Sequence, residues 1–105
     1  MAVHWITFRL HESTIGGRSY QTRYDALLKA VDKHRQGYWW FEPTSFWLVD
    51  SGSTKAQIAT SVKAAIATSH DLVLIGSMDT LGAHLVGNAE ELATLKSLVP
   101  NLTVS

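Results

Sequence analysis

The chain has 105 residues, enough for one domain, and 46% of them are hydrophobic and 17% charged, which is ordinary for a folded globular protein. Nine basic residues balance nine acidic ones, which weakens any proposal of non-specific binding to nucleic acid or a membrane surface, because such binding relies on uncompensated cations. The absence of cysteine excludes disulfides, thiolate metal sites and cysteine nucleophiles.

The N-terminal segment, Val3 to Leu10, predicts a β-strand because its hydrophobicity alternates with a period of two. One face carries Ile6, Phe8 and Leu10, and the other carries Trp5, Thr7 and Arg9. The N-terminus lacks a signal-peptide pattern, and no apolar run approaches the about 20 residues that span a bilayer. We therefore expect a cytoplasmic protein without a membrane partner.

A loop over Glu12 to Arg18, which contains Gly16-Gly17, precedes the first predicted helix. A flexible loop is the favoured interpretation of the two glycines, and a phosphate cradle is the alternative. The segment Thr22 to Asp25 resembles a capping box and predicts the helix start, and Gly37 predicts its end. The apolar stripe of the helix consists of Tyr24, Leu27, Leu28 and Val31.

Two aromatic runs, Tyr38 to Phe41 and Phe46 to Val49, flank a turn that contains Pro43 and predict a β-hairpin. A second capping box, Thr54 to Gln57, predicts another helix, whose apolar stripe consists of Ile58, Val62, Ala65 and Ile66. The continuous apolar run Leu72 to Ile75 predicts a strand that is buried on both faces and ends at Gly76.

The order strand, helix, strand, strand, helix, strand predicts an α+β fold, the ferredoxin-like β-α-β-β-α-β sandwich, with both helices on one side of a four-stranded antiparallel sheet. We expect a single domain over residues 1–105, with a core of about 1–78 and a C-terminal strand and helix extension of about 79–105. In that extension, a short helix is expected to begin at Asn88, with Leu92, Leu95, Leu98 and Val99 as its apolar stripe.

The second face of the predicted sheet is too apolar to face water. Trp5 and Arg9 point to it, and each strand of the hairpin sends an aromatic side chain there in either register. Three covers are possible: the C-terminal helix folding back, a second copy of the chain, or a ligand with flat apolar surfaces such as unstacked bases. The candidate binding residues, on the sheet face or in a dimer interface, are Trp5, Arg9, Trp39 and Trp47.

The aromatic hairpin Tyr38 to Asp50, the capped helix that follows it and the strand Asp71 to Gly76 together resemble the SinR-like group of small bacterial proteins. Those proteins are in turn similar to the spacer-integration subunit of CRISPR systems, the second Cas protein. The resemblance covers about residues 1–80. It implies a ferredoxin-like domain that dimerises, with residues after the fourth strand, here Leu81 to Val86, completing the sheet of the partner.

The same resemblance bears on enzymatic activity. Relatives with a proposed metal-dependent nuclease activity carry a Tyr-Asp pair at the end of the first strand, where two copies would hold one Mg²⁺ through oxygen ligands. The matching pair in this chain is Phe8-Arg9, and a guanidinium repels a cation. Glu12 would replace the aspartate only if the strand ran further. We therefore predict no catalytic residues, no metal site and no cofactor.

The five histidines form no metal-binding spacing. His4 and His11 differ in parity and point to opposite faces of their strand, while His34, His70 and His84 lie near the ends of elements and are interpreted as solvated or helix-capping. Two hypotheses remain. The first is a non-catalytic homodimeric interaction module. The second is a nucleic-acid-binding protein or degenerate nuclease that uses the open sheet with Trp5, Arg9 and Trp47.

Overall fold

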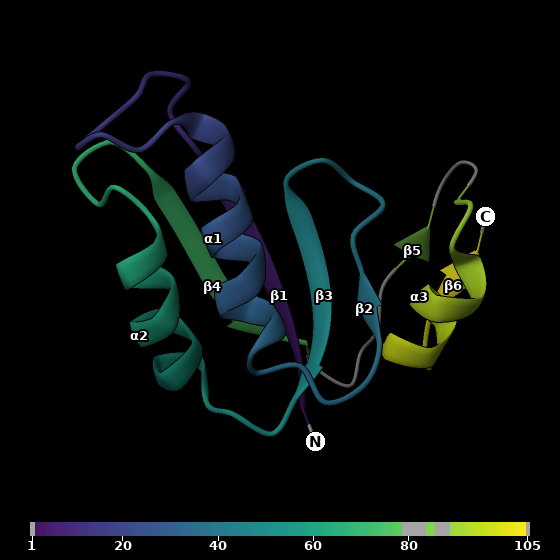
Figure 1. Ribbon diagram of the computed structural model, residues 1–105. Helices are drawn as coiled ribbons and strands as arrows, with labels where there is room; N and C mark the ends of the chain where they lie inside the picture. Colours follow the sequence, from purple (N-terminus) through teal and green to yellow (C-terminus); the bar gives the residue numbers. More distant parts are fainter. Residues whose placement is uncertain (1, 79–83, 86–88, 105) are drawn as a thin grey trace.

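The computed structural model describes residues 2–78, 84–85 and 89–104, and they form an α+β fold (Figure 1). Four strands make an antiparallel sheet in the order β2-β3-β1-β4. Their bounds are β1 Ala2–Arg9, β2 Trp39–Trp40, β3 Phe46–Ser51 and β4 Leu72–Ser77. The expected α+β class is confirmed, and the strand order is compatible with the ferredoxin-like fold.

Two helices, α1 (Tyr20–Asp32) and α2 (Lys55–Ala65), lie side by side on one face of the sheet (Figure 1). The C-terminal segment follows β4 and contains β5 (His84–Leu85), α3 (Leu92–Leu98) and β6 (Thr103–Val104), with β5 and β6 paired in parallel. It lies beyond β2, on the side of the molecule away from α2 (Figure 1).

The first helix begins earlier than the sequence pattern predicted. Ser19 is its N-cap, and the Ser19 Oγ accepts a hydrogen bond from the Thr22 N–H at 3.1 Å, so the prediction of a start at Thr22 was wrong. The helix also ends at Asp32, ahead of the predicted stop at Gly37. Serine caps a helix as well as threonine does, and the two candidate caps lie only three residues apart.

The capping box of α2 is confirmed. The Gln57 N–H donates to the Thr54 Oγ1 at 3.1 Å, and the Thr54 N–H donates to the Gln57 Oε1 at 2.8 Å. Every residue of the predicted α2 stripe is buried.

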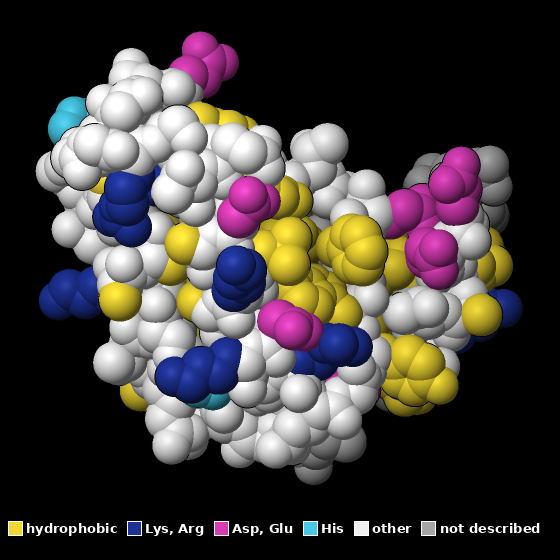
Figure 2. Space-filling model, in the orientation of Figure 1, with side chains coloured by type: hydrophobic (Ala, Val, Ile, Leu, Met, Phe, Trp, Pro, Cys, Tyr) yellow, Lys and Arg dark blue, Asp and Glu magenta, His cyan; other side chains and the backbone are white. Residues whose placement is uncertain are grey.

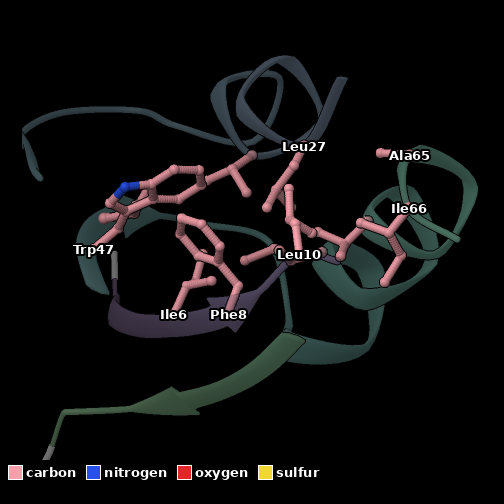
Figure 3. Close-up of a cluster of buried hydrophobic side chains, with 11 residues drawn as sticks. Ile6, Phe8, Leu10, Leu27, Trp47, Ala65 and Ile66 are labelled. Carbon is pink, nitrogen blue, oxygen red and sulfur yellow. The ribbon is translucent and has the colours of Figure 1, made fainter. Parts of the chain in front are cut away.

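The main core lies between the sheet and the two helices (Figure 3). Trp47 is its largest side chain, only 1% exposed, and its ring lies 4.7 Å from that of Phe8. The buried members are Ile6, Phe8, Leu10, Leu27, Val31, Trp47, Val49, Ile58, Val62, Ala65 and Ile66. The β1 alternation, the α2 stripe, and Leu27 and Val31 of the α1 stripe therefore point to one common core. Leu28 is 36% exposed and does not join this core, so its predicted place in the buried stripe was wrong.

Strand β4 contradicts the prediction that it is buried on both faces. Val73 and Ile75 pack against the main core, but Leu72 and Leu74 are 53% and 56% exposed. A continuous apolar run shows that neither face is polar, and it does not show that both faces are covered.

Candidate interaction surface

The face of the sheet opposite the helices has a covered half and an open half. Over β2 and β3, the C-terminal segment packs against Trp40 and Leu48 and forms a second core. The buried members of that core are Trp40, Leu48, Leu95, Leu98 and Val99. Of the three possible covers, the C-terminal helix folding back is therefore the one that the structure shows over the hairpin.

Glu42, in the turn between β2 and β3, fastens the C-terminal segment to the hairpin. Its carboxylate accepts a hydrogen bond from the Glu91 N–H, just ahead of α3. Hydrogen bonds from the backbone N–H groups of Glu91 and Glu90 lower the pKa of Glu42 below its ordinary value of 4.5. The ionised carboxylate therefore holds the two segments together.

The open half, which we call the β1–β4 face, carries Thr7, Arg9, Leu72 and Leu74, none of which belongs to the second core. Residues directly opposite in the register point to the same side, so Arg9 lies beside Leu72 and Thr7 beside Leu74. Two leucines, each more than half exposed, thus stand on adjacent same-face positions of one strand.

Trp5 lies at the border between the two halves of this face, because it also packs against the second core. It is opposite Gly76 in the register, and a Cβ atom built on Gly76 would come within 2.1 Å of the Trp5 Cζ2. The indole therefore occupies the space above β4 that a side chain at position 76 would take. An aromatic ring over a strand glycine is a known way to protect its exposed backbone.

The outer edge of β4 ends the sheet, and within the described residues no strand pairs with it. The Met78 N–H donates to the Val3 carbonyl at 2.9 Å, so Val3 and Met78 are a hydrogen-bonded pair. Hydrogen-bonded and non-hydrogen-bonded pairs alternate along an antiparallel ladder. By that alternation, the backbone groups of Leu74 and Gly76 face β1, while those of Val73 and Ile75 face outward. The strand contains no charged residue and no proline, the usual devices that block pairing at an edge.

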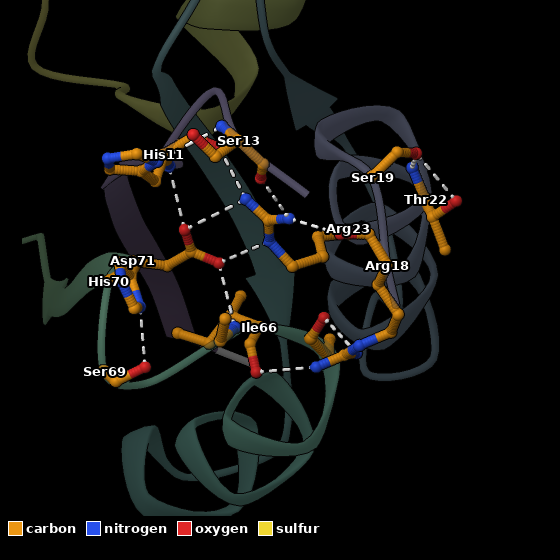
Figure 4. A network of polar contacts seen from close by, with 12 residues as sticks. His11, Ser13, Arg18, Ser19, Thr22, Arg23, Ile66, Ser69, His70 and Asp71 are labelled. Carbon is orange, nitrogen blue, oxygen red and sulfur yellow. Dashed lines mark hydrogen bonds and ion pairs between the residues drawn. The ribbon is translucent and has the colours of Figure 1, made fainter. Parts of the chain in front are cut away.

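A buried ion pair anchors the start of β4 (Figure 4). The Arg23 Nε donates to the Asp71 Oδ2 at 2.9 Å, and both side chains are fully buried. The other Arg23 nitrogens donate to the carbonyl oxygens of His11, Ser13 and Arg18. Asp71 directly precedes Leu72, so this network holds the first residue of the open strand in place.

The carboxylate of Asp71 stays ionised despite its burial. Desolvation raises the pKa of this group, but hydrogen bonds from the Ala67 N–H and from the Arg23 side chain outweigh desolvation, and the net pKa lies below its ordinary value of 3.8. This pair was not predicted, because an arginine in a helix is usually exposed to solvent and Arg23 was interpreted in that way. The available signal was that Arg23 precedes Leu27 and Val31 at intervals of four residues, which places all three on one face of the helix.

The glycine pair lies in a tight turn. Ile15 and Arg18 pair as an antiparallel bridge around Gly16 and Gly17, whose φ angles are 59° and 78°. The Arg18 guanidinium donates to the carbonyl oxygens at residues 65 and 66, at the end of α2 (Figure 4). Arg18 thus caps the C-terminal end of α2.

The four predicted binding residues do not share a surface. Trp5 and Arg9 lie on the face away from the helices, as predicted, whereas Trp39 and Trp47 point to the helix side. Trp47 is part of the main core, so its expected place on the open sheet is corrected. The hairpin register instead sends Trp40 and Phe46 to the opposite face.

The histidines near the helix ends include one that is more enclosed than predicted. The ring nitrogens of His34 contact the Ser53 Oγ at 2.7 Å and the Ser61 Oγ at 2.8 Å, so His34 joins the end of α1 to α2. His4 is buried, and its Nε2 lies 3.0 Å from the Ser53 carbonyl oxygen. His70 is exposed, as predicted.

The sequence matches no protein-family model and no curated protein. Among the described residues, no three His, Asp or Glu side chains lie close enough together to hold a metal ion. None of the described helices is long and apolar enough to cross a membrane.

Proposed function

We propose that the protein is a non-catalytic homodimeric interaction module with a ferredoxin-like core, and that two copies join through the outer edge of β4. The observation that carries this proposal is an uncharged edge strand that pairs with no other strand of the described residues and that also exposes Leu72 and Leu74. An edge of this kind is a template for pairing with another strand. Antiparallel pairing of a strand with its own copy satisfies a two-fold axis, the commonest symmetry of soluble oligomers.

The ladder alternation favours one register. With the two-fold axis at Leu74, the outward backbone groups of Val73 pair with those of Ile75 of the partner subunit. The two Leu74 side chains then meet at the closest cross-strand distance. Leu72 lies opposite Gly76 of the partner subunit, so it packs against the indole above that glycine. This arrangement buries the exposed apolar side chains of the β1–β4 face.

We also propose that the protein is related to the SinR-like proteins and the second Cas protein. The aromatic hairpin and the strand order are compatible with that relationship. It differs from the resemblance in the segment that makes the contact. Most of Leu81 to Val86 lies outside the described residues, so exchange of that segment stays a prediction. Its described residues, His84 and Leu85, pair with Thr103 and Val104 of the same chain.

The test is the molar mass in solution. Light scattering after gel filtration should give twice the chain mass of 11.6 kDa for the natural protein. The variant Leu74→Lys should be a folded monomer, because two lysines would meet at the two-fold axis. The matched control Tyr38→Lys places the same charge at another exposed apolar position, 52% exposed, and should stay a dimer. A monomeric natural protein, or a dimeric Leu74→Lys variant, would refute the proposal.

Nucleic-acid binding is the alternative, and Trp5 and Arg9 on the β1–β4 face favour it. If single-stranded RNA bound there, it would quench Trp5 fluorescence, and Arg9→Ala would weaken the binding. Quenching by RNA in a protein that remains monomeric would replace the dimer proposal with this one. We expect a dimer whose fluorescence RNA does not change.

A further inference from the structure

A groove on the helix side of the molecule lies between α1 and the β2–β3 hairpin, away from the proposed dimer edge. Figure 2 shows hydrophobic side chains gathered there, with acidic and basic side chains beside them. The groove encloses about 330 Å³, within the range of small-molecule sites. Its lining residues, which define the aromatic groove, are Tyr24, Leu28, Asp32, Arg35, Trp39, Phe41 and Trp47.

Four of the seven lining residues are aromatic, and their rings meet at steep angles. The Trp39 ring makes angles of 72° with Phe41 and 74° with Trp47, and the Tyr24 ring makes an angle of 77° with Trp47. Aromatic faces carry negative electrostatic potential, so a ring whose face is open to the groove attracts a cation.

The protein already places a cation of its own against this wall. The Arg35 Cζ lies 5.9 Å from the centre of the Trp39 ring. The Arg35 Nε donates to the Asp32 Oδ1 at 2.8 Å, and the Nη1 donates to the Gly37 carbonyl at 3.2 Å. The guanidinium therefore shows which charge the groove accepts: a cation between an aromatic face and a carboxylate.

This internal cation is displaceable. The Arg35 and Asp32 side chains are 43% and 50% exposed, and an exposed ion pair of this kind contributes little to stability. Phe41 lines the groove and is 64% exposed, so a ligand can reach its ring although one side of it contacts Trp39. Arg35 is thus a weakly held occupant of a site that a better cation would take over.

We propose that the aromatic groove binds a small organic cation of the quaternary ammonium class, which displaces the Arg35 guanidinium from Trp39 and pairs with the Asp32 carboxylate. A quaternary ammonium carries its charge on an apolar surface, which matches aromatic walls better than a hydrated guanidinium does. The enclosed volume suits a free small molecule, and this role is independent of dimerisation.

Choline and its uncharged isostere 3,3-dimethylbutan-1-ol, which have the same shape, test the charge requirement. Calorimetric titration should show choline binding at least about fivefold more tightly than the isostere, the range expected for a cation against aromatic rings. Equal affinities would refute the proposal. Co-sedimentation with phosphatidylcholine vesicles in the absence of saturable choline binding would refute it as well.

Three variants locate the site. Asp32→Asn should weaken choline binding by removing the carboxylate, and Phe41→Ala should weaken it without disturbing the buried core. Arg35→Ala should strengthen it, because the internal competitor is gone. The matched control Lys29→Ala removes the same charge from α1 outside the groove lining, and should leave the affinity unchanged. Weaker binding in Arg35→Ala, or an equal gain in Lys29→Ala, would overturn the proposal.

Discussion

Both faces of the sheet are apolar, but they are covered in different ways. On the helix side, two amphipathic helices bury a continuous core that reaches all four strands. On the other side, the C-terminal segment covers Trp40 and Leu48 and leaves Leu72 and Leu74 exposed. One face therefore has a core that two helices cover, and the other has an open half next to a strand edge that no described strand pairs with.

The strands of this sheet carry apolar side chains on both faces. A strand sends successive side chains to opposite faces, so two apolar faces require two covers. The described residues supply two helices that cover one face and a C-terminal segment that covers half of the other. The missing part coincides with the edge strand that lacks charge and proline, and this coincidence is why we place the self-association there.

The largest expected effect lies on the complete face, at the buried ion pair. Arg23→Ala should lower the free energy of unfolding by about 3–5 kcal/mol, because it leaves the Asp71 carboxylate buried and unpaired. The control Arg35→Ala removes an exposed arginine from a similar pair with Asp32 and should cost at most about 1 kcal/mol. Urea unfolding of both variants measures the difference. Equal losses would contradict the structural role of the network.

Truncation of the second core should show that the two faces unfold separately. Leu98→Ala, at a position 1% exposed, should cost about 2–4 kcal/mol of local stability. Hydrogen exchange should accelerate in α3 and the hairpin and stay slow in β1 and β4, because the main core is untouched. Leu27→Ala, in the main core, should instead accelerate exchange throughout. Identical exchange patterns would mean that the molecule has one cooperative core.

A smaller effect is expected at the indole on the open half. Gly76→Ala should displace the Trp5 ring and lower the free energy of unfolding by about 1–2 kcal/mol. The tryptophan emission should shift to the red, and a Trp5→Phe background should abolish the shift. The neighbouring exposed residue offers a control, Ser77→Ala, which should leave the emission unchanged. An unshifted spectrum in Gly76→Ala would show that Trp5 does not lie over β4.

The smallest effect concerns the attachment of the C-terminal segment. The pKa of Glu42 is lower in the folded state than its ordinary value of 4.5, so its stabilising effect is present above that pH and is lost as the pH falls through the lowered pKa. The amide NMR signal of Glu91 should therefore titrate below pH 4.5, and Glu42→Gln should abolish the titration. Glu12→Gln should preserve it. A signal that titrates unchanged in Glu42→Gln would contradict the contact.

Local signals predicted most of the core. The alternation of β1, the hairpin and the capping box at Thr54 were all correct because each depends on residues close in sequence. The helix start at Thr22 was wrong because Ser19 offers an equivalent hydroxyl. The ion pair of Arg23 and Asp71 was not predicted, because the two residues lie 48 positions apart in the sequence.

The candidate surface was predicted in outline only. The need to cover the second face followed from the pattern, but the pattern does not say which aromatic of each pair points there. The register decided it: Trp39 and Trp47 lie on the helix side, and Trp40 and Phe46 lie on the opposite face.

The sequence by itself determined the element order and the two apolar faces, because periodicity and turn chemistry act between near neighbours. The tertiary structure decided which half of the second face is covered and where Arg35 meets Trp39. Those outcomes depend on contacts between segments far apart in the chain. No local pattern encodes such contacts, since they arise only when the sheet register and the helix positions are fixed together.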